Sequence, residues 1–391
     1  MDFTQLLRVM VDRNASDLFV TAGARPTIKV DGTLKPLTRE PISEEQSQSL
    51  VLSTMNDKQL AEFEGTRECN FALSFDKLGR FRISAFYQRD VPGMVLRRIN
   101  DYIPSFEELN LPPVLRDLSL TKRGLILFVG GTSTGKSTSL ASMIDYRNAK
   151  TRGHIITIED PIEFVHEHKN CIITQREVGI DTESFEVALK NTLRQAPDVI
   201  LMGEIRTRET MQYGLAFAET GHLCLATLHA NNANQALDRI ISFFPPESHD
   251  QLWMDLSLNL KAIVAQQLLP TNDGKGRRAA IEVLINTPLV QDMIRKGQVH
   301  EIKEVMKKSV NLGMQTFDQA LFELYREGVV SYEAALSHAD SANDLRLMIK
   351  LDAQTNPAID EGLAETEFVL QDEDDFIEDL GFDGQVMEPR D

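Results

Sequence analysis

The chain has 391 residues, of which 42% are hydrophobic and 26% charged, which excludes a disordered or fibrous protein and favours two globular units with extensions. Its formal charge is −18, but residues 352–391 hold 14 acidic residues and one basic residue and so carry −13 of it. The rest of the chain is only mildly acidic, which argues against a nucleic-acid-binding protein because phosphate backbones select basic faces.

The cysteines and the N-terminal segment indicate a cytoplasmic protein. Cys69, Cys171 and Cys224 are an odd number at wide spacing, with neither a C-x-x-C pair for zinc nor a framework for disulfides. The first residues, MDFTQLLRVMVDRN, have polar residues in amphipathic helical spacing and do not resemble a signal peptide. Because no apolar run approaches the length of a membrane span, we expect any work at a membrane to depend on partners.

Residues 1–100 are predicted to form a small α+β domain. SDLFV and PTIKVDGTLKPL are typical of short strands, with a tight turn at Asp31 and Gly32. Two helical stretches follow, SEEQSQSLVLSTM and DKQLAEFE, and then CNFALSF, RFRISAFYQ and GMVLRRI return to a strand pattern. The segment NDYIPSFEELNLPP carries three prolines and little periodicity, so we predict a linker over residues 101–118.

The next part, residues 119–287, is predicted to be an α/β core. Four apolar runs, GLILFVG, HIITIED, DVILMGE and HLCLATLHA, are separated by helices, a pattern typical of a doubly wound, mainly parallel sheet. One of those helices is SFEVALKNTLRQ, with Ser184 as its cap and Phe185, Ala188, Leu189 and Leu193 on one face.

After this core, residues 288–351 have the pattern of a helical bundle. Residues 352–391 are predicted to be an acidic, disordered tail, and a short docking motif within it is the alternative.

A phosphate-binding loop follows the first apolar run of the core. The match to G-x-x-x-x-G-K-[ST] lies between a strand and a helix, and the candidate binding residues are Gly130, Gly131, Thr132, Ser133, Thr134, Gly135, Lys136, Ser137 and Thr138. Glycines let backbone N–H groups turn inward around phosphate oxygens, and the helix N-terminus favours the anion. The lysine reaches the terminal phosphates and the Ser137 hydroxyl holds Mg²⁺, so the loop predicts binding of a nucleoside triphosphate.

Acidic residues end two of the other strands. Glu204 follows the run 199–202, where many P-loop enzymes place a metal-binding carboxylate. Glu159, Asp160 and Glu163 follow another run, where a carboxylate could align the attacking water. The alternative is that these acids only cap helices. Their occurrence together with the phosphate-binding loop favours a catalytic role, with Ser137 and Glu204 as the Mg²⁺ ligands.

Histidines and arginines complete the candidate site. His229 ends its strand where the nucleotide should lie and is predicted to contact the γ-phosphate, whereas His222 could be an ordinary core residue. The N-terminal domain also contains Arg80, Arg82, Arg89, Arg97 and Arg98. Arginine-lined strands usually face solvent, so their number alone leaves this alternative open.

With these motifs in hand, the chain resembles the secretion ATPases of the type II and type IV pilus superfamily, and within them the pilus retraction ATPases of the PilT/PilU type. The phosphate-binding loop, TIEDPIEF, PDVILMGEIR, TGHLCLATLHANNANQALDRIISFFP and GMQTFDQAL match in order over about residues 3–350. The resemblance implies a PAS-like N-terminal domain and a RecA-like P-loop ATPase domain that alternate around a hexameric ring. It also implies pilin filament disassembly through an inner-membrane platform protein.

The resemblance assigns roles by position. Lys136 and Ser137 match the Walker A lysine and magnesium ligand, Glu163 matches the catalytic glutamate of the acidic box, and Glu204 matches the Walker B glutamate. His229 matches the residue of the histidine box. Arg82 and Arg97 match the N-terminal arginines that reach the nucleotide of their own or an adjacent subunit as arginine fingers, which stabilise developing phosphate charge.

Three departures favour the PilU branch of this family. Gly131, Thr132, Ser133 and Thr134 replace the usual loop residues, Thr207 stands where an aspartate is common, and the acidic tail extends beyond the usual end of PilT. Related extension ATPases typically carry a tetracysteine zinc motif, which three scattered cysteines cannot build.

The favoured hypothesis is therefore a homo-hexameric, ATP- and Mg²⁺-dependent motor for type IV pilus retraction and twitching motility. It would act at the inner-membrane base of the pilus machine as an accessory to a PilT-like partner. A nucleotide-gated assembly factor that barely hydrolyses ATP and a RecA-like nucleic-acid translocase are the alternatives, and the mild acidity disfavours the second.

Overall fold

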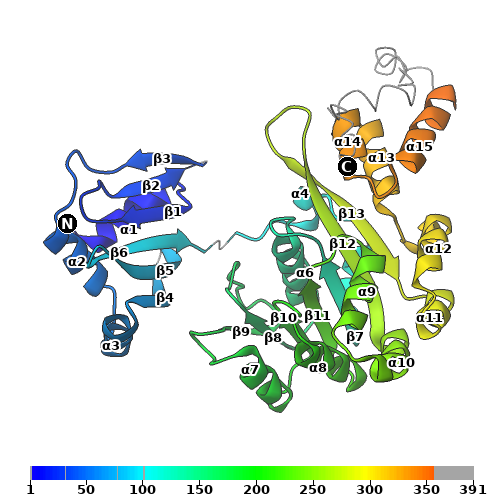
Figure 1. Ribbon diagram of the computed structural model, residues 1–391, viewed down its shortest axis with the longest axis horizontal. Coiled ribbons are helices and arrows are strands. Elements are labelled where there is room, and N and C mark those ends of the chain that lie inside the picture. The colour runs from blue at the N-terminus through cyan, green and yellow to red at the C-terminus, as the bar shows by residue number, and fades with distance from the viewer. Residues whose placement is uncertain (1, 31, 77, 100–101, 356–391) are drawn as a thin grey trace, which may run out of the picture.

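The computed structural model describes residues 2–30, 32–76, 78–99 and 102–355. Figure 1 shows an N-terminal body joined by one connecting segment to a larger α/β body, with the last helices at the far side of the latter. The predicted acidic tail lies, from residue 356 onward, outside the described residues. None of the described helices combines the length and apolarity that crossing a membrane requires.

The N-terminal body is an antiparallel sheet packed against helices, which confirms the α+β prediction. Its elements are α1 (Phe3–Asp12), β1 (Asp17–Val20), β2 (Thr27–Val30), β3 (Thr33–Pro36), α2 (Glu44–Leu52), α3 (Asp57–Thr66), β4 (Glu68–Phe75), β5 (Gly79–Gln88) and β6 (Val91–Arg98). The strand order is β3-β2-β1-β6-β5-β4. On β5, Phe81 and Ile83 join the core while Arg80 and Arg82 point to the other face, as the two-residue period of a strand requires.

The larger body is built on a seven-stranded sheet in the order β13-β12-β7-β11-β10-β8-β9. Its strands are β7 (Gly124–Val129), β8 (His154–Glu159), β9 (Ile172–Glu177), β10 (Val199–Met202), β11 (Leu223–Leu228), β12 (Leu260–Pro270) and β13 (Arg277–Ile285). All neighbouring strands are parallel except β12 and β13. The predicted doubly wound, mainly parallel sheet is therefore confirmed, although strands β9, β12 and β13 were not predicted from the sequence.

Helices bury both faces of this sheet, which explains its continuous apolar strands. On β7, Leu127 contributes to the cluster on one face and Phe128 to the cluster on the other. The helices of the α/β core are α4 (Phe106–Leu109), α5 (Val114–Ser119), α6 (Lys136–Lys150), α7 (Phe185–Thr192), α8 (Arg208–Glu219), α9 (Ala233–Ser242) and α10 (His249–Asn259). Ser184 caps α7 as predicted, but Leu193 is exposed and lies in the following 3₁₀ turn, so its predicted place on the buried face is wrong.

The C-terminal region is helical, as predicted. It consists of α11 (Pro288–Arg295), α12 (Ile302–Lys308), α13 (Phe317–Arg326), α14 (Tyr332–His338) and α15 (Ala342–Thr355).

The linker predicted over residues 101–118 is shorter in the structure. Helices α4 and α5 occupy residues 106–109 and 114–119, and their Phe106 and Leu115 are buried against the sheet. These apolar contacts fix the position of the segment against the core, whereas its prolines had suggested a linker. The other predicted domain boundaries stay predictions.

Candidate active site

The phosphate-binding loop connects β7 to α6 and needs glycine at two positions. A Cβ on Gly130 would lie 2.6 Å from the Gln266 carbonyl oxygen, and one on Gly135 would lie 2.7 Å from the Gln266 amide nitrogen. Gly135 also has a φ of +87°, which disfavours any side chain. Strand β12 therefore lies directly against the loop and fixes its path.

The Lys136 ammonium lies over this loop. Its Nζ donates to the carbonyl oxygens of Gly130 at 2.9 Å and Gly131 at 2.6 Å. Burial lowers the pKa of Lys136, and the negative charges of Glu204 and Glu163 oppose that shift. The lysine side chain is thus held at the centre of the loop, the position from which it can donate to phosphate oxygens.

Gln266 anchors the loop from β12. Its Nε2 donates to the Thr134 carbonyl at 2.9 Å, and its Oε1 accepts from the Ser139 hydroxyl at 2.8 Å. Both Gln266 and Ser139 are buried, so these bonds have no competition from water. Gln266 could not be predicted as a site residue from the sequence, because its partners lie far away along the chain.

We expect the substitution Gln266→Leu to lower the free energy of unfolding by about 1–3 kcal/mol, because the buried Ser139 hydroxyl and Thr134 carbonyl lose their partner. The same variant should bind ADP more weakly, since the loop is no longer held. Urea unfolding and ADP titration check both effects. The matched control is Gln267→Leu, on the other face of the same strand. Equal losses in the two variants would contradict the anchoring role.

The acidic residue predicted after β10 faces this loop. Glu204 accepts at Oε2 from Arg206 Nη2 at 2.7 Å, and its Oε1 lies 3.2 Å from His229 Nε2 at the end of β11. Both oxygens of the carboxylate therefore have a partner that fixes their direction. The sequence analysis missed Arg206, although its place two residues after Glu204 was a local signal.

One cavity of about 360 Å³ brings together half of the predicted site residues. The candidate site residues that line it are Thr132, Ser133, Lys136, Ser137, Glu163, Glu204 and His229. Gly135 and Thr138 instead line a smaller neighbouring cavity beside Gln266. His222 bonds to Thr220 and to the Phe217 carbonyl at the end of α8, in keeping with the alternative of an ordinary structural histidine.

The cavity can accommodate Mg²⁺ beside a triphosphate. The Ser137 hydroxyl and the Glu204 carboxylate are hard oxygen ligands that line it, and Mg²⁺ at such sites takes one or two protein ligands and completes its shell with phosphate oxygens and water.

The strand end at β8 contributes a second carboxyl group, Glu159, which is half-buried and lines the same cavity. Glu159 Oε1 accepts from the Thr157 hydroxyl at 2.6 Å and from Gln175 Nε2 at 3.3 Å. Burial raises its pKa to about 7, against the effect of these two hydrogen bonds. Glu163, four residues later, is exposed and lines the cavity directly.

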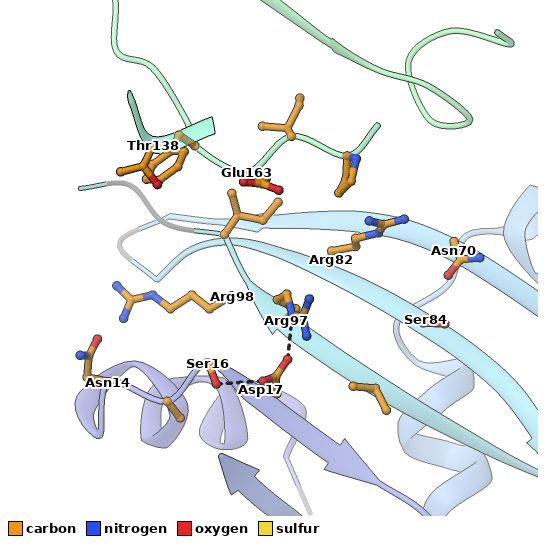
Figure 2. Close-up of a pocket in the computed structure, with 16 residues that line it drawn as sticks. Asn14, Ser16, Asp17, Asn70, Arg82, Ser84, Arg97, Arg98, Thr138 and Glu163 are labelled. Carbon is orange, nitrogen blue, oxygen red and sulfur yellow. Dashed lines mark hydrogen bonds and ion pairs between the residues drawn. The ribbon is translucent and has the colours of Figure 1, made fainter. Parts of the chain in front are cut away.

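A second cavity, of about 700 Å³, lies between the N-terminal strands and the core. Figure 2 shows Arg82, Arg97 and Arg98 on one side of it and Glu163 and Thr138 on the other. Arg82 and Arg97 are register partners on β5 and β6, and Arg97 Nε donates to Asp17 at 2.9 Å. Because Glu163 lines both cavities, the predicted arginines reach the border of the phosphate-binding site without entering it.

Comparisons with known proteins identify the family of this chain. The family model described as "Type II/IV secretion system protein" matches residues 2–336. The chain belongs to this family. It is 66% identical to the type IV pilus ATPase PilU of Pseudomonas aeruginosa, over 91% of this chain and 93% of that protein. The PilT retraction ATPase of the same organism is 41% identical, over 87% and 98%.

Solved structures agree with these matches. The pilus retraction motor PilT with bound ADP superposes with a TM-score of 0.84 at 39% identity, over 89% of this chain and all of that chain. The Legionella pneumophila ATPase DotB superposes with a TM-score of 0.73 at 25% identity, over 89% of this chain and 94% of that one. The chain is thus a member of the PilT/PilU retraction ATPases and more like PilU than PilT, which confirms the resemblance drawn from its motifs.

Proposed function

We propose that this chain is an ATP-hydrolysing motor that powers type IV pilus retraction. The observation that carries the proposal is the single cavity in which the P-loop Lys136 and Ser137 meet the strand-end carboxylates Glu163 and Glu204. The overall reaction is ATP and water to ADP and phosphate, coupled to the disassembly of pilin filaments. Nucleotide binding is supported by the PilT structure with ADP, and the link to pili by the PilU and PilT relatives.

The predicted site residues that line the cavity have distinct roles in this reaction. Lys136 neutralises charge on the terminal phosphates, and Glu163 orients the attacking water and accepts its proton. His229 contacts the γ-phosphate. It also contacts Glu204, the proposed Mg²⁺ ligand, and so connects the two parts of the site. Mg²⁺, held by Ser137 and Glu204 when bound, supplies further charge neutralisation.

Arg82 and Arg97 are proposed as arginine fingers. Their position at the border of the site requires a shift of the N-terminal domain, or an adjacent copy of the chain, to bring a guanidinium onto the phosphates. In a homo-hexameric ring, each chain has an adjacent copy, and its N-terminal domain can shift relative to the core. In the cell the ring would dock at the inner-membrane base of the pilus machine, contact its platform protein and assist a PilT-like ATPase.

The test is the ATPase rate per subunit of the purified chain as a function of its concentration, with Glu204→Ala as the blank. We expect a rate that rises with concentration, because sites completed between subunits form only in the assembled ring, and that vanishes in the blank. A rate equal to the blank at every concentration would contradict an autonomous motor and favour the nucleotide-gated assembly factor.

A further inference from the structure

Strand β9 lies at the edge of the core sheet. It pairs in parallel with β8, and Glu177 at its end is the register partner of Glu159. A cavity of about 440 Å³ is lined by N-terminal residues, including Arg82, and by Glu177 with the turn that follows it. The end of β9 therefore meets the N-terminal domain.

The contact across this boundary is an ion pair whose carboxylate is buried. Arg80 Nη2, on β5, lies 3.8 Å from Glu177 Oε2, and the Glu177 side chain is only 2% exposed. Burial raises the pKa of Glu177, and the positive charges of Arg80 and Arg82 oppose this shift. A carboxylate buried so completely needs a cation close by, since an unpaired buried charge is strongly destabilising. The arginines of the N-terminal domain supply it.

The pair is loosely made. Among the described residues, Arg80 Nε and Glu177 Oε2 are both buried and have no hydrogen-bond partner. The ionic contact at 3.8 Å is longer than a charge-assisted hydrogen bond. A modest movement of the N-terminal domain can therefore tighten it or break it.

Strand β9 also holds the loop that carries Glu163. Gln175 Nε2 donates to the Phe164 carbonyl at 2.9 Å, and Gln175 Oε1 accepts from the His166 backbone N–H at 2.8 Å. The backbone N–H of Ile162 also acts to lower the pKa of Glu177, against the effect of burial. Gln175 of β9 thus holds the loop immediately after Glu163, and Glu177 ends the same strand.

We propose that Glu177 is a positioning residue that couples the placement of the N-terminal domain, sensed through Arg80, to the orientation of the loop carrying Glu163. With Arg80 in contact, the carboxylate stays buried at the end of β9, the strand that holds the loop through Gln175. When Arg80 withdraws, the uncompensated carboxylate turns towards water, the end of β9 shifts, and Glu163 loses its fixed direction. Its kinetic consequence rests on the proposed ATPase function, and its structural consequence does not.

The experiment compares Arg80→Gln, Glu177→Gln and the double variant in the full chain. We expect Arg80→Gln to speed backbone hydrogen exchange of residues 160–168 about tenfold, and to lower kcat about tenfold with KM changed less than about twofold. In the Glu177→Gln background the buried group is neutral and needs no cation. There, adding Arg80→Gln should change either quantity by less than about twofold.

Two further variants serve as controls for this comparison. Arg67→Gln removes an arginine that pairs with Asp90 within the N-terminal domain and should leave the exchange of residues 160–168 unchanged. Arg80→Lys keeps the charge and should restore slow exchange, which decides the question even if Glu177→Gln does not fold. Unchanged exchange in Arg80→Gln, or full additivity in the double variant, would overturn the coupling. A wild-type chain without ATPase activity would overturn the proposed function, while hydrogen exchange would still test the coupling.

Discussion

The substitution Lys136→Ala is expected to remove ATP hydrolysis completely and to weaken ADP binding at least about a hundredfold. One preorganised group facing developing charge contributes about 10²–10³ in rate, and this lysine also binds the ground-state phosphates. Its Nζ is held by two carbonyls of the loop, so no neighbouring cation can replace it without rebuilding the loop. Isothermal titration with ADP and a phosphate-release assay measure the two effects.

The matched control is Lys150→Ala, which removes an exposed lysine at the other end of the same helix. It should hydrolyse ATP at the wild-type rate. If Lys136→Ala kept more than about a tenth of the wild-type rate, the loop would not be the phosphate site.

The sequence predicted the phosphate-binding loop and the four central strands because their signals are local. A buried parallel strand is apolar on both faces, and the loop motif follows one of these strands directly. The edge and hairpin strands carry a weaker signal. In β12, Gln266 and Gln267 interrupt the apolar run because Gln266 serves the loop, and β9 ends in polar residues that hold the Glu163 loop.

The sequence contains a helix start signal for α4 within the segment that was predicted to be a linker. Ser105 and Glu108 form a capping box at the start of α4, a pattern that can be read from the sequence. The burial of Phe106 and Leu115 is a tertiary effect, which the local sequence around Pro112 and Pro113 does not predict.

The choice among the N-terminal arginines could not be made from spacing. Arg82 and Arg97 were selected by resemblance alone, and the structure places them side by side because β5 and β6 pair in that register. Arg80 points to the same face but meets the buried Glu177. Only the packing of the N-terminal domain against the core shows which partner each of these arginines meets.

The substitution Glu163→Gln is expected to lower kcat by about 10²–10⁴ while ADP affinity stays within about threefold of wild type. Loss of a general base slows the chemical step by this amount, and an exposed glutamine of the same size leaves the cavity intact. Single-turnover hydrolysis and ADP titration separate the two quantities. Glu167→Gln, on an exposed residue further along the same segment, is the control and should retain wild-type activity.

Glu159 is the rival for this role, and pH distinguishes the two carboxyl groups. Burial raises the pKa of Glu159 to about 7, so a reaction that used it as the base would gain rate as the pH rises through 7 and the carboxyl loses its proton. Glu159 also lines the phosphate-site cavity, but one of its oxygens accepts from both Thr157 and Gln175, whereas Glu163 is exposed and lines both cavities. We therefore expect Glu163→Gln to be slow at every pH between 6 and 9. A variant that instead kept wild-type activity with an inflection near pH 7, lost in Glu159→Gln, would move the catalytic role to Glu159.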